Sequence, residues 1–222
     1  MKTKRGICLL LALVLLLVLA ACASREPEPE TTPEPEETPA PTATPVPERM
    51  LVVYFSPETE AADTGETTKG ETAVLAELLA EKLGADLWEI VPARGAYPTD
   101  REELRKTAET EQASKARPAI GGTLPELEAY DTVLLGAPVW NGDWAMILYS
   151  FLEGTDLAGK KLVPFGVYEG EAPAGLEKKI AVACPYSTVT PGLLLRPEDM
   201  TGKPLVLENS VRRWLLGLNY TA

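Results

Sequence analysis

The chain has 222 residues, with 33 Asp and Glu against 21 Lys and Arg, which gives a formal net charge of −12. Such an acidic protein is poorly suited to bind nucleic acid or anionic lipid surfaces. The sequence contains no histidine, which excludes Ser-His-Asp catalysis, Cys-His catalysis and any His-ligated zinc site.

Residues 1–21 are expected to form a secretory signal peptide. Lys2, Lys4 and Arg5 make a cationic start, Ile7–Leu19 is almost entirely apolar, and small residues precede Cys22. The alternative is an uncleaved membrane helix, but this apolar run is shorter than the roughly 20 residues that a span requires.

The sequence Leu-Ala-Ala-Cys at 19–22 resembles the lipobox of bacterial lipoproteins. The resemblance implies cleavage before Cys22, lipidation of Cys22, and a lipid-anchored protein at the extracytoplasmic face of the cell membrane. Cleavage would remove three basic residues and no acidic ones, so the net charge would change from −12 to −15. Cys184 would then be the remaining free thiol, and we expect it to be a buried filler.

Residues 22–49 comprise this cysteine and a linker rich in Glu, Pro and Thr. Such a composition buries too little apolar surface to fold, and its prolines and like charges keep it extended. We therefore expect a disordered stalk in front of one folded domain, residues 50–222.

Two kinds of apolar pattern alternate along residues 50–222. Continuous or alternating apolar runs predict strands, and apolar residues three and four apart predict helices. In chain order, we expect strand Met50–Phe55, helix Thr72–Leu83, strand Asp86–Val91, helix Asp100–Lys115, strand Asp131–Ala137, helix Trp144–Leu152, strand Lys161–Gly166, a short helix Gly175–Val182, strand Thr188–Leu195 and helix Glu208–Leu218. This alternation favours an α/β fold with a parallel sheet and helices on both faces.

Five short segments of this domain resemble the flavodoxin family, in the branch with a long loop after the first strand. They are Leu51–Ser56, Lys69–Thr72, Leu83–Ile90, Ala116–Pro118 and Tyr130–Trp140, in the order and spacing of the family. The resemblance implies a doubly wound five-stranded parallel sheet of order 2-1-3-4-5. It also implies FMN as the cofactor, bound between strands one and three, and flavodoxin is a well-known example of binding at such a switch point.

The predicted site has one end for the phosphate and one for the flavin ring. Hydroxyls of Ser56 and Thr72, with backbone amides of Gly70, Glu71 and Thr72, would hold the phosphate, because a helix N-terminus favours negative charge. Two turns would enclose the ring: Ala137, Pro138, Val139, Trp140, Asn141 and Gly142 on one side, and Tyr168, Glu169 and Gly170 on the other. Trp140 and Tyr168 are the candidates for stacking, which is worth about 1 kcal/mol beyond area burial.

Each of these assignments has a structural alternative. Trp140 could belong to the core or to a lid, Tyr168 could be a surface aromatic, and Thr72 could only cap its helix. The sequence also departs from the family pattern, because a long acidic excursion, residues 56–68, replaces the compact phosphate loop. Glu71 stands where this branch usually has asparagine, and a carboxylate near a phosphate opposes binding unless it points away.

Three functions are compatible with these residues. The first is an extracytoplasmic electron carrier that binds FMN, exchanges electrons with an unknown donor and acceptor, and has no catalytic residue or metal ligand. The second is an NAD(P)H-dependent quinone or flavin reductase of the same fold, although the sequence has no Gly-x-Gly-x-x-Gly signature. The third is a flavin-free module whose fold serves as a binding surface.

Overall fold

The computed structural model describes residues 48–60, 65–200 and 204–220. The predicted signal peptide, Cys22 and nearly all of the predicted linker lie outside the described residues. The strands of the central sheet are β1 (Met50–Tyr54), β4 (Asp86–Glu89), β5 (Thr132–Gly136), β8 (Lys161–Val167), β9 (Thr188–Val189) and β10 (Leu193–Leu195). Two small hairpins lie outside this sheet: β2 (Thr59–Glu60) with β3 (Thr67–Thr68), and β6 (Val139–Trp140) with β7 (Asp143–Trp144).

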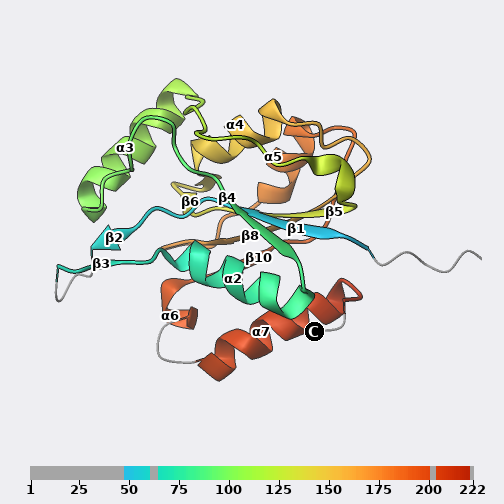
Figure 1. The fold of residues 1–222 in the computed structure, drawn as a ribbon. Coiled ribbons are helices and arrows are strands. Elements are labelled where there is room, and N and C mark those ends of the chain that lie inside the picture. The colour runs from blue at the N-terminus through green and yellow to red at the C-terminus, as the bar shows by residue number, and fades with distance from the viewer. Residues whose placement is uncertain (1–47, 61–64, 201–203, 221–222) are drawn as a thin grey trace, which may run out of the picture. The chain divides into compact units, whose positions relative to one another are not determined.

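Helices cover both faces of the sheet. They are α2 (Glu71–Leu83), α3 (Arg101–Ser114), α4 (Met146–Gly154), α5 (Leu176–Ala183), α6 (Pro197–Met200) and α7 (Pro204–Gly217), with a short 3-10 turn at Leu127–Ala129. Helices α3, α4 and α5 lie on one side of the sheet, and α2, α6 and α7 lie on the other (Figure 1). No helix within the described ranges combines the length and the apolar character needed to cross a bilayer.

The sheet confirms the expected α/β architecture and strand order. Its strands run in the order β10-β8-β5-β1-β4, and all of their pairings are parallel. Numbered along the chain, this is the order 2-1-3-4-5. The order reverses between β1 and β5, so the chain leaves the carboxyl ends of these two strands in opposite directions.

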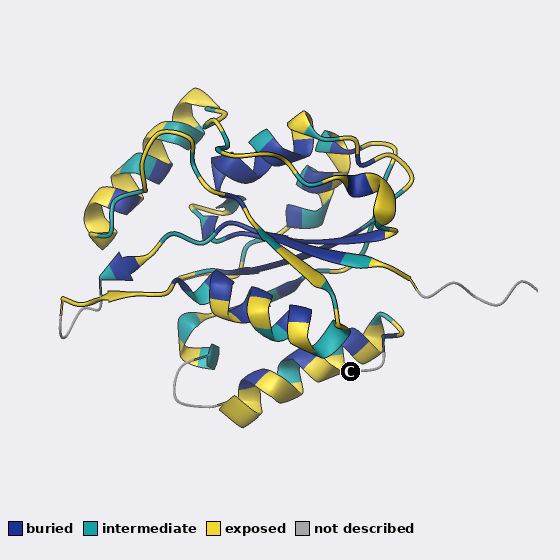
Figure 2. Cartoon of the chain, viewed as in Figure 1, coloured by how far each residue is buried: buried dark blue, intermediate teal, exposed yellow. Residues whose placement is uncertain are grey.

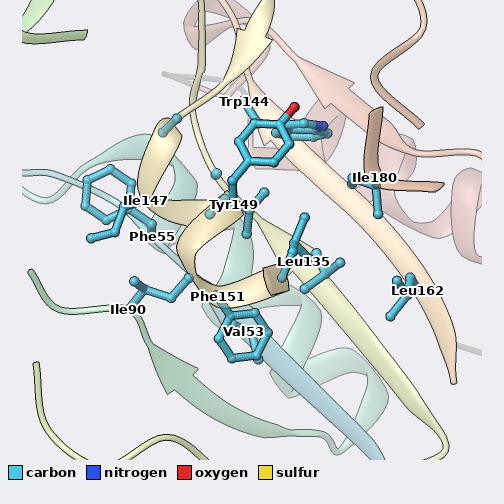
Figure 3. Packing of buried hydrophobic residues seen from close by; sticks show 14 of the residues in the cluster. Val53, Phe55, Ile90, Leu135, Trp144, Ile147, Tyr149, Phe151, Leu162 and Ile180 are labelled. Carbon is cyan, nitrogen blue, oxygen red and sulfur yellow. The ribbon is translucent and has the colours of Figure 1, made fainter. Parts of the chain in front are cut away.

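Two hydrophobic clusters explain why the central strands read as continuous apolar runs. From β1 and the residue after it, Leu51, Val53 and Phe55 join the cluster formed with α4 and α5. Val52 and Tyr54 join the cluster formed with α2 and α7 on the other face. Figure 3 shows the first cluster, and Figure 2 shows that the central strands are buried whereas the edge strand β4 is largely exposed. A strand covered on both faces needs apolar residues at every position.

The predicted fifth strand, Thr188–Leu195, is divided into β9 and β10. Leu162 of β8 pairs with Val189, but Phe165 pairs with Leu193, so the fifth strand holds one extra residue in between. Pro164 of β8 and Pro191 of the fifth strand both lie in this interval, and the N–H of Gly192 donates to the carboxylate of Glu177 at 3.2 Å. Because proline has no amide hydrogen, it cannot donate a ladder hydrogen bond, and the pairing is interrupted there.

Most of the remaining element boundaries agree with the sequence patterns to within two residues. An exception is α7, which begins at Pro204, one turn before the predicted start at Glu208. Helix α6, the 3-10 turn and both hairpins were not predicted. Cys184 is buried, as expected, and burial raises the pKa of its thiol to about 11, which keeps it protonated and unreactive at neutral pH.

The start of the domain is fixed to the amino-terminal edge of the sheet. The carboxylate of Glu48 accepts hydrogen bonds from the hydroxyls of Thr132 and Tyr220. The backbone N–H of Arg49 donates to the carboxylate of Asp131 at 3.1 Å. The chain therefore enters β1 at an anchored position.

Candidate functional site

A cavity of about 440 Å³ opens at the carboxyl ends of β1, β5 and β8. Its walls are the segments that follow these strands, together with the N-terminal turn of α2 and one side of α3. The volume is within the range of small-molecule sites. The cavity lies at the point where the strand order reverses, which is where open α/β sheets bind ligands.

The structure brings most of the predicted site residues together around this cavity. Those that line it are Ser56, Gly70, Glu71, Thr72, Pro138, Val139, Trp140, Asn141, Tyr168 and Glu169. Ala137, Gly142 and Gly170 do not line it. Ala137 is buried and donates its N–H to the carbonyl of Phe165 at 3.3 Å, while the carbonyl of Gly142 accepts a hydrogen bond from Lys179 Nζ at 3.1 Å.

One end of the cavity is formed by the N-terminus of α2. The N-cap is Gly70, with φ −63° and ψ 146°, and it has no side-chain cap; the alternative that Thr72 caps this helix is therefore wrong. A Cβ at Gly70 would lie 2.3 Å from the Ser56 hydroxyl and 2.3 Å from the Pro57 carbonyl oxygen. Glycine thus allows the turn after β1 to pack against the helix terminus, whose first amides have no partner within the helix.

The hairpin β6–β7 forms another wall and presents Trp140. Asn141 and Gly142 make its turn with φ values of 48° and 76°, and positive φ at both central residues is the hallmark of a type I′ turn. The Trp140 ring lies edge-on to Phe55, with centroids 6.0 Å apart and planes at 89°, and 5.9 Å from Tyr97. Trp140 therefore packs against the core and lines the cavity at the same time.

Tyr168 follows β8 on a third wall. It is half-buried and packs against the same cluster as Trp140. Its backbone is held on both sides, because it forms a bridge with Val139 and donates its N–H to the carbonyl of Leu195 at 3.0 Å. The two segments that were predicted to enclose the flavin ring are therefore joined through their backbones.

Helix α3 contributes a wall that the sequence analysis did not include. Arg101, Leu104, Arg105 and Ala108 all line the cavity. Leu104 and Ala108 are the buried residues of this otherwise polar helix. Two apolar residues four positions apart on a charged helix mark the side of the helix that packs against the rest of the domain. This spacing is the sequence signal that could have revealed the wall.

Charged side chains of opposite sign meet at the cavity mouth. Arg101 Nη1 donates to the carboxylate of Glu169 at 3.1 Å, and its Nη2 lies 3.7 Å from the carboxylate of Glu71. One guanidinium therefore spans from the N-terminus of α2 to the turn after β8. It offsets the charge of Glu169 and of Glu71, the carboxylate that was expected to oppose an anionic ligand.

A family model described as flavodoxin matches residues 49–211. The chain belongs to the flavodoxin family.

Solved structures with the same fold include two proteins that are provisionally described as flavoproteins. One, from Bacteroides eggerthii, is 28% identical, with a TM-score of 0.61 over 78% of this chain and 99% of that chain. The other, from Bacteroides uniformis, is 30% identical, with a TM-score of 0.57 over 72% of this chain and 96% of that chain. A flavoprotein from Lactobacillus acidophilus, solved in complex with FMN, shares the fold at 21% identity, with a TM-score of 0.52 over 70% and 97% of the two chains. A search of curated proteins found no match.

This flavodoxin-family domain also holds a half-buried acid, Glu111, beside its aromatic wall. The hydroxyl of Tyr97 donates to both carboxylate oxygens of Glu111, at 2.9 and 3.0 Å. Burial raises the pKa of Glu111, and the hydrogen bond from Tyr97 partly offsets that rise. Burial, followed by the charge of Glu111, raises the pKa of Tyr97 as well. Tyr97 thus stays protonated and links the end of α3 to the ring cluster around Trp140.

Proposed function

We propose that this protein binds FMN in the cavity at the carboxyl ends of β1, β5 and β8 and transfers electrons. The observation that supports this most is the meeting of two different ends in one cavity: an uncapped helix terminus with Ser56 and Thr72, and the aromatic pair Trp140 and Tyr168. Bound FMN supplies the redox chemistry, while the protein supplies binding, orientation and electrostatics.

The residues present fit a phosphorylated flavin. Gly70 leaves the first turn of α2 without a side-chain cap and close to the Ser56 hydroxyl, as a phosphate cradle requires. Trp140 and Tyr168 are half-buried, so each combines a fixed ring with a surface open to the cavity. The hydroxyls of Ser56 and Thr72 and the backbone amides of Gly70, Glu71 and Thr72 would hold the phosphate. The two aromatic residues would contact the isoalloxazine.

The test is a titration of the chain from residue 23 onward with FMN, followed by an absorption spectrum of the separated complex. We expect a yellow, stoichiometric complex that does not oxidise NADH or NADPH at an appreciable rate. Steady turnover of a reduced nicotinamide would instead favour the reductase, and a colourless protein would leave only the flavin-free module.

We further propose that Cys22 is lipidated and anchors the protein at the extracytoplasmic face of the membrane. The cationic start, the apolar run and Leu-Ala-Ala-Cys at 19–22 support this. Cells that express the full chain should incorporate labelled palmitate into the protein and retain it in the membrane fraction. Cys22→Ala should abolish the label, and a label that persists in this variant would contradict the assignment.

A further inference from the structure

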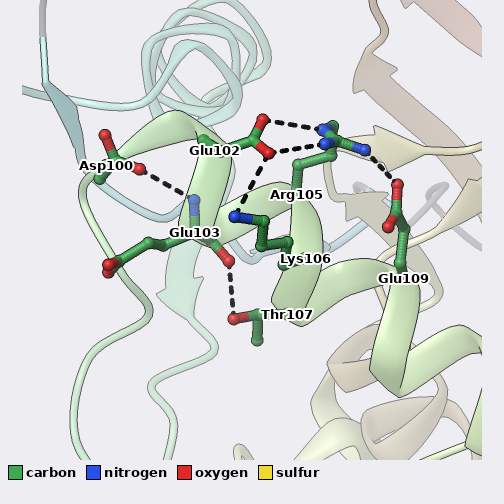
Figure 4. A network of polar contacts seen from close by, with 7 residues as sticks. All are labelled: Asp100, Glu102, Glu103, Arg105, Lys106, Thr107 and Glu109. Atoms are coloured by element: carbon green, nitrogen blue, oxygen red, sulfur yellow. Dashed lines mark hydrogen bonds and ion pairs between the residues drawn. The ribbon is translucent and has the colours of Figure 1, made fainter.

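Two arginines of α3 line the cavity, but they use their hydrogen-bond donors differently. Arg105 donates from Nε and Nη2 to Glu102, at 3.3 and 2.8 Å, and from Nη1 to Glu109, at 2.5 Å (Figure 4). All of its partners belong to α3. Within the described ranges, Arg101 donates a single hydrogen bond, from Nη1 to Glu169. Its Nη2 is 3.7 Å from Glu71, which is an ion pair beyond hydrogen-bond distance.

The two residues that precede Arg101 hold its backbone in place. Asp100 caps α3 by accepting a hydrogen bond from the N–H of Glu103 at 2.9 Å. Thr99 is tied to β2, because its carbonyl accepts from the N–H of Glu60 at 3.0 Å and its hydroxyl donates to the Glu60 carboxylate at 2.8 Å. Arg101 therefore projects from a fixed position, and its half-exposed side chain reaches the first residue of α2.

A cation beside the N-terminus of α2 would strengthen phosphate binding in this cavity, because the charged side chains of its lining are on balance acidic. Its charged lining consists of Glu71, Glu102 and Glu169 against Arg101 and Arg105, an excess of one negative charge. Each of the three guanidinium nitrogens of Arg105 already donates a hydrogen bond within its own helix. Arg101 is the arginine of this pair with an uncommitted donor directed toward the N-terminus of α2.

We propose that Arg101 binds the phosphate of the flavin through Nη2 and makes the site prefer FMN over riboflavin. This inference rests on the proposed function. A phosphomonoester carries about −1.5 to −2 charges near neutral pH, whereas the carboxylate of Glu71 carries one, so the phosphate is the stronger acceptor. Arg101 can keep its hydrogen bond to Glu169 because that bond uses the other terminal nitrogen.

A different role for Arg101 would be to close the cavity by tying α3 to Glu169. The two roles differ in the ligand they affect. If Arg101 only shaped the cavity, its loss would lower the affinities for FMN and riboflavin equally, since these two ligands share the ring. If Arg101 contacted the phosphate, its loss would lower the affinity for FMN alone.

The experiment titrates FMN and riboflavin separately into the chain from residue 23 onward, using flavin fluorescence, and compares Arg101→Gln with Lys106→Gln. Lys106 lies outside the cavity lining on the same helix and pairs with Glu102 at 3.4 Å, so its replacement removes the same charge without reaching the ligand. Thermal melts check that the variants are folded. Arg101→Lys, which keeps the charge, should retain part of the preference for FMN.

We expect Arg101→Gln to weaken FMN binding about tenfold, the low end for a charge-assisted hydrogen bond from a half-exposed group. Riboflavin affinity, and both affinities of Lys106→Gln, should change by less than about twofold. An equal loss for both flavins, or an unchanged FMN affinity in Arg101→Gln, would overturn the phosphate contact. A wild-type protein that binds neither flavin would overturn the proposed function itself.

Discussion

Gln112 Nε2 donates a hydrogen bond to the backbone carbonyl of Trp140 at 2.6 Å. Its side-chain carbonyl accepts a second bond from Asn141 Nδ2 at 3.0 Å. One side chain of α3 therefore fixes the end of β6 and the turn that follows it. The position of the Trp140 ring thus depends on a helix that is separate from it in sequence.

Gln112→Ala should release this hairpin. We expect a loss of about 1 kcal/mol in the free energy of unfolding, the usual net value of a hydrogen bond, and a severalfold weaker affinity for FMN. Ser114→Ala is the control, because the hydroxyl of Ser114 donates to carbonyls of its own helix. Chemical denaturation and FMN titration measure both effects, and equal behaviour of the two variants would contradict the coupling.

The two ends of the cavity should respond differently to substitution. Trp140→Ala removes a ring that FMN and riboflavin would both contact, so both affinities should fall about fivefold or more. Thr72→Ala should weaken FMN by a similar factor and leave riboflavin unchanged, because the hydroxyl is expected to meet only the phosphate. Thr72→Ser keeps the hydroxyl and should bind FMN normally. If neither Ala variant alters FMN affinity, the ligand binds elsewhere.

Gly70→Ala should disturb the cavity without removing any functional group. The new Cβ would lie 2.3 Å from Ser56 Oγ and the Pro57 carbonyl oxygen, so the turn after β1 must move. We expect a loss of about 1–3 kcal/mol in unfolding free energy, as for other overpacked sites, together with weaker FMN binding. Gly154→Ala is the matched change, since a Cβ there meets nothing within 4 Å. Equal thermal stability of the two variants would rule out the steric account.

The titration of Glu111 should make the free energy of unfolding depend on pH. Burial raises its pKa in the folded state, so the folded protein binds more protons than the unfolded chain between the two pKa values. This contribution to stability is therefore greatest at low pH and declines as pH rises through the folded pKa. Tyr97→Phe removes the hydrogen bond that lowers this pKa, so the decline should extend to higher pH. A carbon-13 NMR titration of the Glu111 carboxyl tests the direction of the shift, and Glu111→Gln should remove this part of the pH dependence.

The sheet could be predicted from the sequence because its central strands are apolar on both faces and its helices have regular apolar spacing. The break in the fifth strand falls at Pro191 and Gly192, a local signal that the strand prediction did not use. The pairing of this interval with Pro164 of the neighbouring strand could not be predicted. Pairing partners are fixed by the tertiary fold, and a pattern confined to one segment does not contain them.

The cavity walls at the strand ends could be predicted for a similar reason, since parallel strands bring their carboxyl ends to one edge. Helix α3 was predicted, but its role as a cavity wall was missed because the helix is polar and only Leu104 and Ala108 are fully buried. The contact between Arg101 and Glu169 joins residues 68 positions apart. No local pattern indicates such a pair. The β6–β7 turn is different, since the dipeptide Asn141-Gly142 is itself a hairpin signal that was not used in the prediction.

The hydrogen bonds of Glu48 and Arg49 fix where the chain enters the domain relative to the cavity. These residues sit at the amino-terminal edge of the sheet, and the cavity opens at the carboxyl edge. The polypeptide therefore enters the described domain at the edge of the sheet opposite the cavity. A partner that docks at the cavity would approach the domain from the side opposite this entry point.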